Sequence, residues 1–148
     1  MYRVIDFTPT PDTGIMASAD VIADTEAMPP ALLRIGSGSL RSLVVVDKDD
    51  QKAAIDIYFL SSSGSMGAEN SGASISDANG ATILGMVAVA VADYKDLGGV
   101  SVAMFRGLDL PLISASGSNL VYCAIVNGAG TPTYTASGLV LRLGVLQD

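Results

Sequence analysis

Apolar and polar positions alternate with a period of two along most of the chain, and the pattern is clearest in residues 40–60, LRSLVVVDKDDQKAAIDIYFL. Two apolar runs, 43–46 and 55–60, flank a short polar segment. Their β-branched and aromatic residues fit a pleated, half-buried surface. In the second run every other residue, from Ile55 to Phe59, points to one face, because successive side chains of a strand alternate. The segment therefore predicts a β-hairpin with one face on a core.

The same alternation recurs in about eight to ten short segments, separated by Gly, Ser, Asn, Asp and Pro, as in an all-β sandwich or barrel. Residues 76–84 are the exception, since Ser76 or Asp77 can cap a helix there while Gly80 weakens its interior. We expect at most one short helix at that point. The residues predicted to face the core are Leu43, Val45, Ile55, Ile57, Phe59, Val87, Val89, Val102, Ile125, Leu141 and Leu143.

These features predict an all-β fold, an antiparallel β-sandwich in which two sheets pack their apolar faces together. A jelly roll is the best specific prediction. A chain of 148 residues is one domain by its length. We expect residues 15–148 to form that domain and residues 1–14 to form an extended N-terminal arm.

The arm joins a possible strand, with Tyr2 and Val4, to a segment that Pro9 and Pro11 keep extended. Such an arm can add a strand to the sheet edge of a neighbouring protein, where main-chain hydrogen bonds supply affinity. The alternative is that residues 2–7 are an edge strand of the chain's own sandwich. The sequence leaves the two alternatives open.

The composition changes the picture of the surface. Apolar residues make up 49% of the chain and charged residues 16%, against about 25% in typical domains. A monomer with so few charges exposes more apolar surface than usual, which predicts contacts with other chains. We expect a homo-oligomer, most readily a trimer, that buries outward-facing residues of the strands, namely Tyr58, Leu60, Tyr122 and Leu146.

The net charge of −7 and the lack of a Lys or Arg cluster argue against binding to nucleic acid or to an anionic membrane surface. The N-terminal segment does not read as a signal peptide. The longest strongly apolar, charge-free segment, residues 81–92, is shorter than the roughly 20 residues of a membrane-spanning helix.

No motif in the sequence carries chemistry. Histidine is absent, which removes the commonest general base and metal ligand. No nucleophile elbow or phosphate-binding loop is present. Cys123 lies in the apolar run LVYCAIV, as a buried core cysteine does. We therefore expect no enzyme activity, no catalytic residue and no cofactor.

Three carboxylates in four residues, Asp47, Asp49 and Asp50, form the one weak candidate for a cation site. Carboxylate oxygens are the ligands that calcium prefers. The glycine and glutamate of an EF-hand loop are missing, however, and Lys48 and Lys52 offset the charge. A solvated hairpin turn without a metal explains the segment better.

Four segments resemble a group of small structural proteins encoded by tailed phages and prophages. They are DKDDQKAAIDIYFL (47–60), ISDAN (75–79), ADYKDLGG (92–99) and GTPTYTASGLVLRLGVLQD (130–148). The resemblance implies a virion protein on the capsid surface, of the decoration, cement or auxiliary head type. Its partners would be the major capsid protein or other virion proteins, and it supplies no catalytic residues to carry over.

A carbohydrate-binding module or a tail- or fibre-associated β-sandwich is the alternative. Sugar binders usually need exposed aromatic platforms. With no Trp, three Phe and five Tyr, this chain is poor in them. The sequence therefore favours the structural protein.

Overall fold

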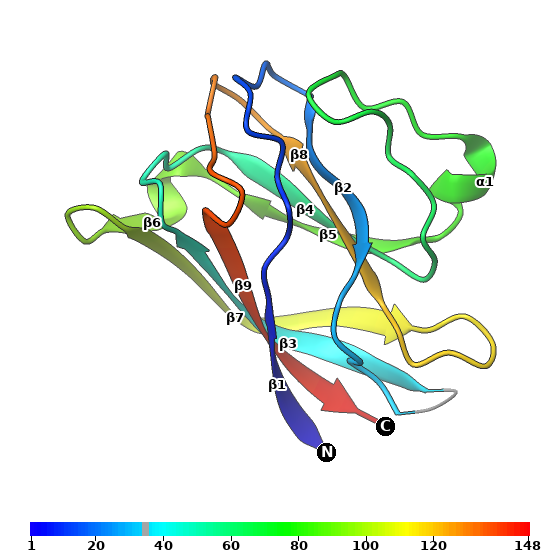
Figure 1. The fold of residues 1–148 in the computed structure, drawn as a ribbon. Coiled ribbons are helices and arrows are strands. Elements are labelled where there is room, and N and C mark those ends of the chain that lie inside the picture. Colours follow the sequence, from blue (N-terminus) through cyan, green and yellow to red (C-terminus); the bar gives the residue numbers. More distant parts are fainter. Residues whose placement is uncertain (34–35) are drawn as a thin grey trace.

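Two antiparallel sheets packed face to face make up the fold of residues 1–33 and 36–148, the part of the chain that this computed structural model describes (Figure 1). The prediction of an all-β sandwich is confirmed. Within the described residues, helical structure is limited to α1 (Asp77–Gly80), which Ser76 caps as predicted, and the short 3-10 turn η1 (Val91–Asp93). In these two ranges, no helix is long and apolar enough to span a bilayer.

One sheet has five strands and the other has four. The five-stranded sheet runs in the order β1 (Tyr2–Phe7), β9 (Leu139–Gln147), β3 (Ser37–Asp47), β7 (Ser101–Ile113) and β6 (Tyr94–Asp96). The four-stranded sheet runs in the order β2 (Val21–Ala27), β8 (Tyr122–Asn127), β4 (Ile55–Leu60) and β5 (Ile83–Val89).

The pairing of the strands is that of a jelly roll. Strand β1 pairs with β9, β2 with β8, β3 with β7 and β4 with β5, so the first half of the chain pairs in order with the second. A long antiparallel hairpin gives this pattern when it is rolled into two layers. The pairs β3·β9 and β4·β8 then complete the two sheets, and β6 adds a short edge strand.

The core lies between the sheets and contains every residue that the alternation assigned to it except Val102. Ser101 and Ala103 are fully buried instead, and Val102 is half-exposed on the outer face. The prediction for β7 was wrong by one residue. Because the side-chain period is two, a one-residue difference in register moves every side chain of a strand to the other face. In the observed register buried Ser101 lies opposite buried Asp47, and its hydroxyl donates a hydrogen bond to Asp50.

A bulge interrupts β7, which pairs within the five-stranded sheet and also contacts β5 of the other sheet. Leu40 pairs with Leu110 while Ser42 pairs with Arg106, which leaves two extra residues in β7. Gly107 takes the left-handed conformation (φ 68°) that such a bulge needs. Beyond the bulge, the Leu110 side chain packs against the bare backbone of Gly85 in β5, where a Cβ atom would lie 2.8 Å from it.

The segment after β4 covers the outer face of the four-stranded sheet (Figure 1). Met66 is buried there in a second, smaller core with Leu60, and Tyr58 and Tyr122 pack against it. Residues 61–72 are mostly Ser and Gly in sequence, and Tyr58, Leu60 and Tyr122 on the strands beneath them were predicted to be exposed. Leu60, predicted as an interface residue, is fully buried inside the chain.

The side chain of Asp24 in β2 holds this covering loop in place. Its carboxylate accepts hydrogen bonds from the Ser65 hydroxyl and the Met66 amide, both at 2.7 Å. Burial alone would raise the pKa of Asp24, but hydrogen bonds from Ser65, Met66 and Thr25 together lower it below its ordinary value of 3.8.

The N-terminal segment is part of the sandwich. Strand β1 pairs with β9 along its whole length as an edge strand, which is the alternative to a free arm. The following segment crosses to the other sheet, where the Asp12 amide donates to the Ile22 carbonyl at 2.8 Å. Pro9 and Pro11, predicted to meet another protein, are buried.

Substitutions of two neighbouring valines on β3 test which side chains of the strand face the core and which face outward. Val45 is fully buried and Val46 faces outward. In urea denaturation, Val45→Ala should lower the free energy of unfolding by about 2–3 kcal/mol, from lost burial and a cavity. Val46→Ala should cost less than about 1 kcal/mol, the range of strand propensity. Equal losses would contradict the register.

The Asp24 anchor predicts how acid acts on the covering loop. A carboxyl group whose pKa is lower in the folded state than in the unfolded state stabilises the fold at pH values above its ordinary pKa of 3.8. This contribution disappears as the pH falls through the pKa of the folded state. Amide exchange at Met66 should therefore become faster at low pH, relative to intrinsic exchange, in the wild type. In Asp24→Asn it should be fast already at neutral pH. Asp77→Asn, in the exposed turn of α1, is the control; unchanged exchange in Asp24→Asn would disprove the anchor.

Candidate functional site

The acidic turn between β3 and β4 uses its carboxylates inside the chain. The Asp47 carboxylate is buried and accepts hydrogen bonds from the backbone amides of Asp49 (3.1 Å) and Lys52 (2.8 Å). Asp50 accepts a hydrogen bond from the Ser101 hydroxyl and forms an ion pair with Lys52 at 3.2 Å. These contacts allow the left-handed conformations of Asp50 and Lys52 (φ 53° and 51°).

The same turn fastens the loop before β9. Asp49 accepts hydrogen bonds from both the amide and the hydroxyl of Thr135, at 2.8 and 3.0 Å. The Gln51 side chain accepts one from the Thr133 amide at 3.0 Å. The turn is therefore a connection between loops at one end of the sandwich.

The three carboxylates of the predicted cation candidate are not gathered around one point. Burial, opposed by backbone hydrogen bonds, raises the pKa of Asp47, because the ionised carboxylate is disfavoured in this buried position. In the described part of the chain, no group of three His, Cys, Asp or Glu side chains is arranged to hold a metal ion. Cys123 is buried, as predicted, and burial raises the pKa of its thiol.

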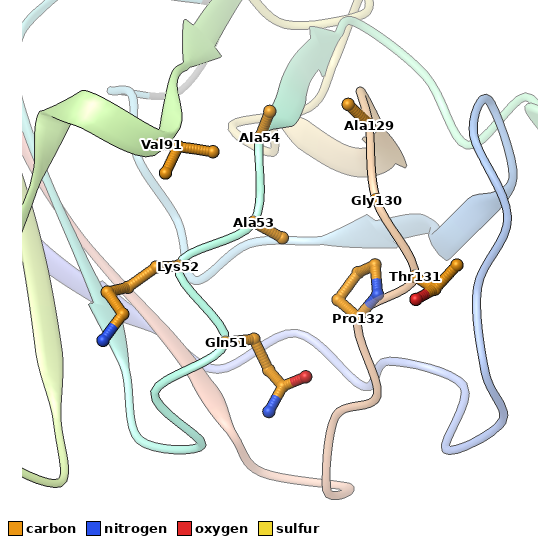
Figure 2. A pocket seen from close by; sticks show the side chains of 9 residues that line it. All are labelled: Gln51, Lys52, Ala53, Ala54, Val91, Ala129, Gly130, Thr131 and Pro132. Carbon is orange, nitrogen blue, oxygen red and sulfur yellow. The ribbon is translucent and has the colours of Figure 1, made fainter.

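A hollow of about 460 Å³ lies beside this turn, between residues 51–54 and 129–132 (Figure 2). Alanine methyl groups, Gly130 and the ring of Pro132 form most of its wall, with Val91 at one side. The polar ends of Gln51 and Lys52 are already bonded to Thr133, Asp49, Asp50 and Asp96. The lining thus leaves few polar groups to orient a small substrate.

The outer face of the five-stranded sheet is the most distinctive surface. Pairing registers place two neighbouring rows of side chains on it. One row runs Val140, Val46, Val102 and Lys95 across β9, β3, β7 and β6. The next runs Asp6, Arg142, Val44 and Met104 across β1, β9, β3 and β7.

The centre of this face is apolar and open. The four valines are partly exposed and Met104 is 59% exposed. Tyr2, Val4 and Leu146 continue the apolar surface along β1 and β9. The Tyr2 hydroxyl lies 3.1 Å from that of Ser42, which sets its ring above Gly144. Contiguous exposed apolar surface of this kind is typical of protein contact sites.

Charged residues surround the apolar centre. Arg142 pairs with Asp6 at 2.6 Å, and Arg41 pairs with Asp109 at 2.9 Å. Lys95 and Arg106 face the same side, and neither forms an ion pair with any residue of 1–33 or 36–148. An acidic protein thus carries two unpaired cations on this face.

The predicted interface residues divide into two groups. Tyr2, Val4 and Leu146 lie together on the outer face of the five-stranded sheet, 39–59% exposed. Leu60, Tyr58 and Tyr122 belong to the second core, and Pro9 and Pro11 are buried. Sequence reasoning did not name Val44, Val46 and Val140 as interface residues, and it placed Val102 in the core. The alternation pointed the first three outward, but only the pairing of the strands shows that all four valines adjoin one another on one face.

No family model matches the chain, and no curated protein sequence matches it. Among solved structures, a chain from the structure of Turnip Yellow Mosaic Virus at 100 K aligns with a TM-score of 0.31 and 9% sequence identity. The alignment covers 100% of this chain and 93% of the virus chain.

The occupied carboxylates predict that calcium does not stabilise the protein. Asp47, Asp49 and Asp50 already accept hydrogen bonds, and Lys52 lies beside Asp50. The melting temperature should be the same in EDTA and in millimolar calcium. A rise of several degrees in calcium that Asp49→Asn abolishes would reveal a cation site at the turn.

Proposed function

We propose that the chain is a structural protein of a virus particle, a decoration or cement protein on the head of a tailed phage. Its work would be to bind protein surfaces on the capsid exterior, those of the major capsid protein or of neighbouring copies. The observation that carries the proposal is the uncovered apolar face of the five-stranded sheet, centred on Val44, Val46, Val102, Val140 and Met104.

The fold agrees with this role. Jelly rolls recur in viral capsid proteins, although lectins and cupins also use them. The two sheets bury a dense core, and the loops at one end are tied together by the acidic turn. The chain thus combines a well-packed core with one uncovered apolar sheet face. The resemblance of its sequence segments to phage structural proteins points in the same direction.

The scarcity of exposed aromatic side chains favours this function over carbohydrate binding. Sugar rings stack on exposed aromatic side chains, and this chain has five tyrosines and three phenylalanines. Tyr134 and Phe59 are buried in the main core, and Tyr58 and Tyr122 pack beneath the covering loop. Tyr2 is the aromatic side chain more than half exposed, and a single ring makes a poor platform for a glycan.

Virions of the phage that encodes the chain provide the test. Peptide mass spectrometry of purified particles should detect the chain as a component. Negative-stain images with a labelled antibody should place it over the head. Its absence from particles, or label confined to tail fibres together with binding to a glycan array, would overturn the proposal in favour of the carbohydrate-binding module.

A further inference from the structure

We propose that the outer face of the five-stranded sheet is covered by the same face of a second copy of the chain, related by a two-fold axis parallel to β3. The second copy is one specific partner for the surface that carries the proposed function. The contact itself rests on the structure, and only its occurrence on a virus particle rests on the proposed function. A two-fold contact brings the same patch of both copies together, so the patch must be complementary to itself.

The order of the strands makes the apolar centre self-complementary. Strand β3 is the middle of the five, with β9 and β1 on one side and β7 and β6 on the other. A rotation about β3 therefore lays β9 of one copy over β7 of the other. In the first row, Val46 meets its own copy and Val140 meets Val102. Valines then pack on valines, as on the inner faces of two packed sheets.

The charges at the edges are also complementary under this rotation. Asp6 lies in β1 at one edge, and Lys95 lies in β6 at the opposite edge. The rotation places the β1 edge of one copy over the β6 edge of the other. Asp6 and Lys95 are then one row apart, about 7 Å along the strands. The flexible lysine side chain spans this distance. Lys95 therefore gains the Asp6 carboxylate of the other copy as a partner, and that carboxylate also pairs with Arg142 of its own chain.

Arg106 acquires a partner by the same operation. It pairs across the sheet with Ser42, which in turn pairs with Gly144 of β9. The rotation lays β7 over β9, so Arg106 of one copy faces the Tyr2 ring above Gly144 of the other. A guanidinium over a tyrosine ring is a favourable cation–π arrangement. Both unpaired cations of the face are thus accounted for, and neither meets its like.

The size of the face predicts a dissociable dimer. Five strands spaced about 4.8 Å apart give a width of about 20 Å, and with about 20 Å along the strands the face covers about 400 Å² on each copy. A stable standard interface buries about 800 Å² on each side. The dimer should therefore form at micromolar concentrations or above and fall apart on dilution, which sets the conditions of the experiment.

Light scattering over a dilution series of the purified full chain is the first test. The mass should rise from that of one 15.1 kDa chain toward twice that value as the concentration approaches several hundred micromolar. Val46→Lys, which places two like charges at the axis, should remain a monomer. Ala88→Lys, on an exposed position of β5 opposite Asp56, is the matched control and should dimerise like the wild type.

A mixing experiment tests the two-fold charge pairs and does not depend on the valine variant. Lys95→Glu alone should weaken the dimer because the new Glu faces Asp6, and Asp6→Lys alone should weaken it because the new Lys faces Lys95. An equimolar mixture should associate more strongly than either variant, since each of its contacts joins opposite charges. Circular dichroism of each variant should match the wild type.

The outcomes of these experiments distinguish a failure of the two-fold dimer from a failure of the proposed function. A wild-type chain that is monomeric at all concentrations, or a dimer that Val46→Lys leaves intact, overturns the second-copy contact. If that monomer still needs Val46 to be incorporated into particles, the face binds the shell directly and the proposed function survives. A dimer with the predicted mixing behaviour, from a chain absent from virions, would support the inference and overturn the proposed function.

Discussion

The register of β3 between its two neighbours determines most of what the molecule can do. This strand pairs with β7 on one side and with β9 on the other, so its alternation is transmitted to both. At its end, buried Asp47 lies opposite Ser101 and holds the turn through backbone amides. A slip of one residue would exchange the inner and outer faces of the strands. The core and the outer face therefore depend on the same pairing.

Much of the fold could be predicted from the sequence because one face of most strands is buried. The alternation of Ile55, Ile57 and Phe59 with polar neighbours has one solution on a half-buried sheet. Strand β7 was harder, since both Val102 and Ala103 are apolar and either could face the core. The choice depends on the partner strand and on the buried polar pair, neither of which local sequence specifies.

The surface was predicted less well than the core for a physical reason. Outward-facing Leu60 looks exposed within its own strand, but the loop that follows the strand folds back and covers it with Met66. The loop's polar composition gave no sign of this contact, and its anchor Asp24 lies about 40 residues earlier in the chain. Tyr2 and Leu146 are exposed because no segment within residues 1–33 and 36–148 covers the first sheet where they lie, and their part in an interface stays a prediction.

The measurement that tests this account most directly is disulfide trapping at the axis. Val46 meets its own copy under the proposed rotation, and the native Cys123 is buried and does not compete. Val46→Cys, oxidised with glutathione disulfide at high protein concentration, should form a covalent dimer on a non-reducing gel. Ala88→Cys, exposed on the other sheet, should react far more slowly. A Val46→Cys chain that forms no more dimer than Ala88→Cys would contradict the account.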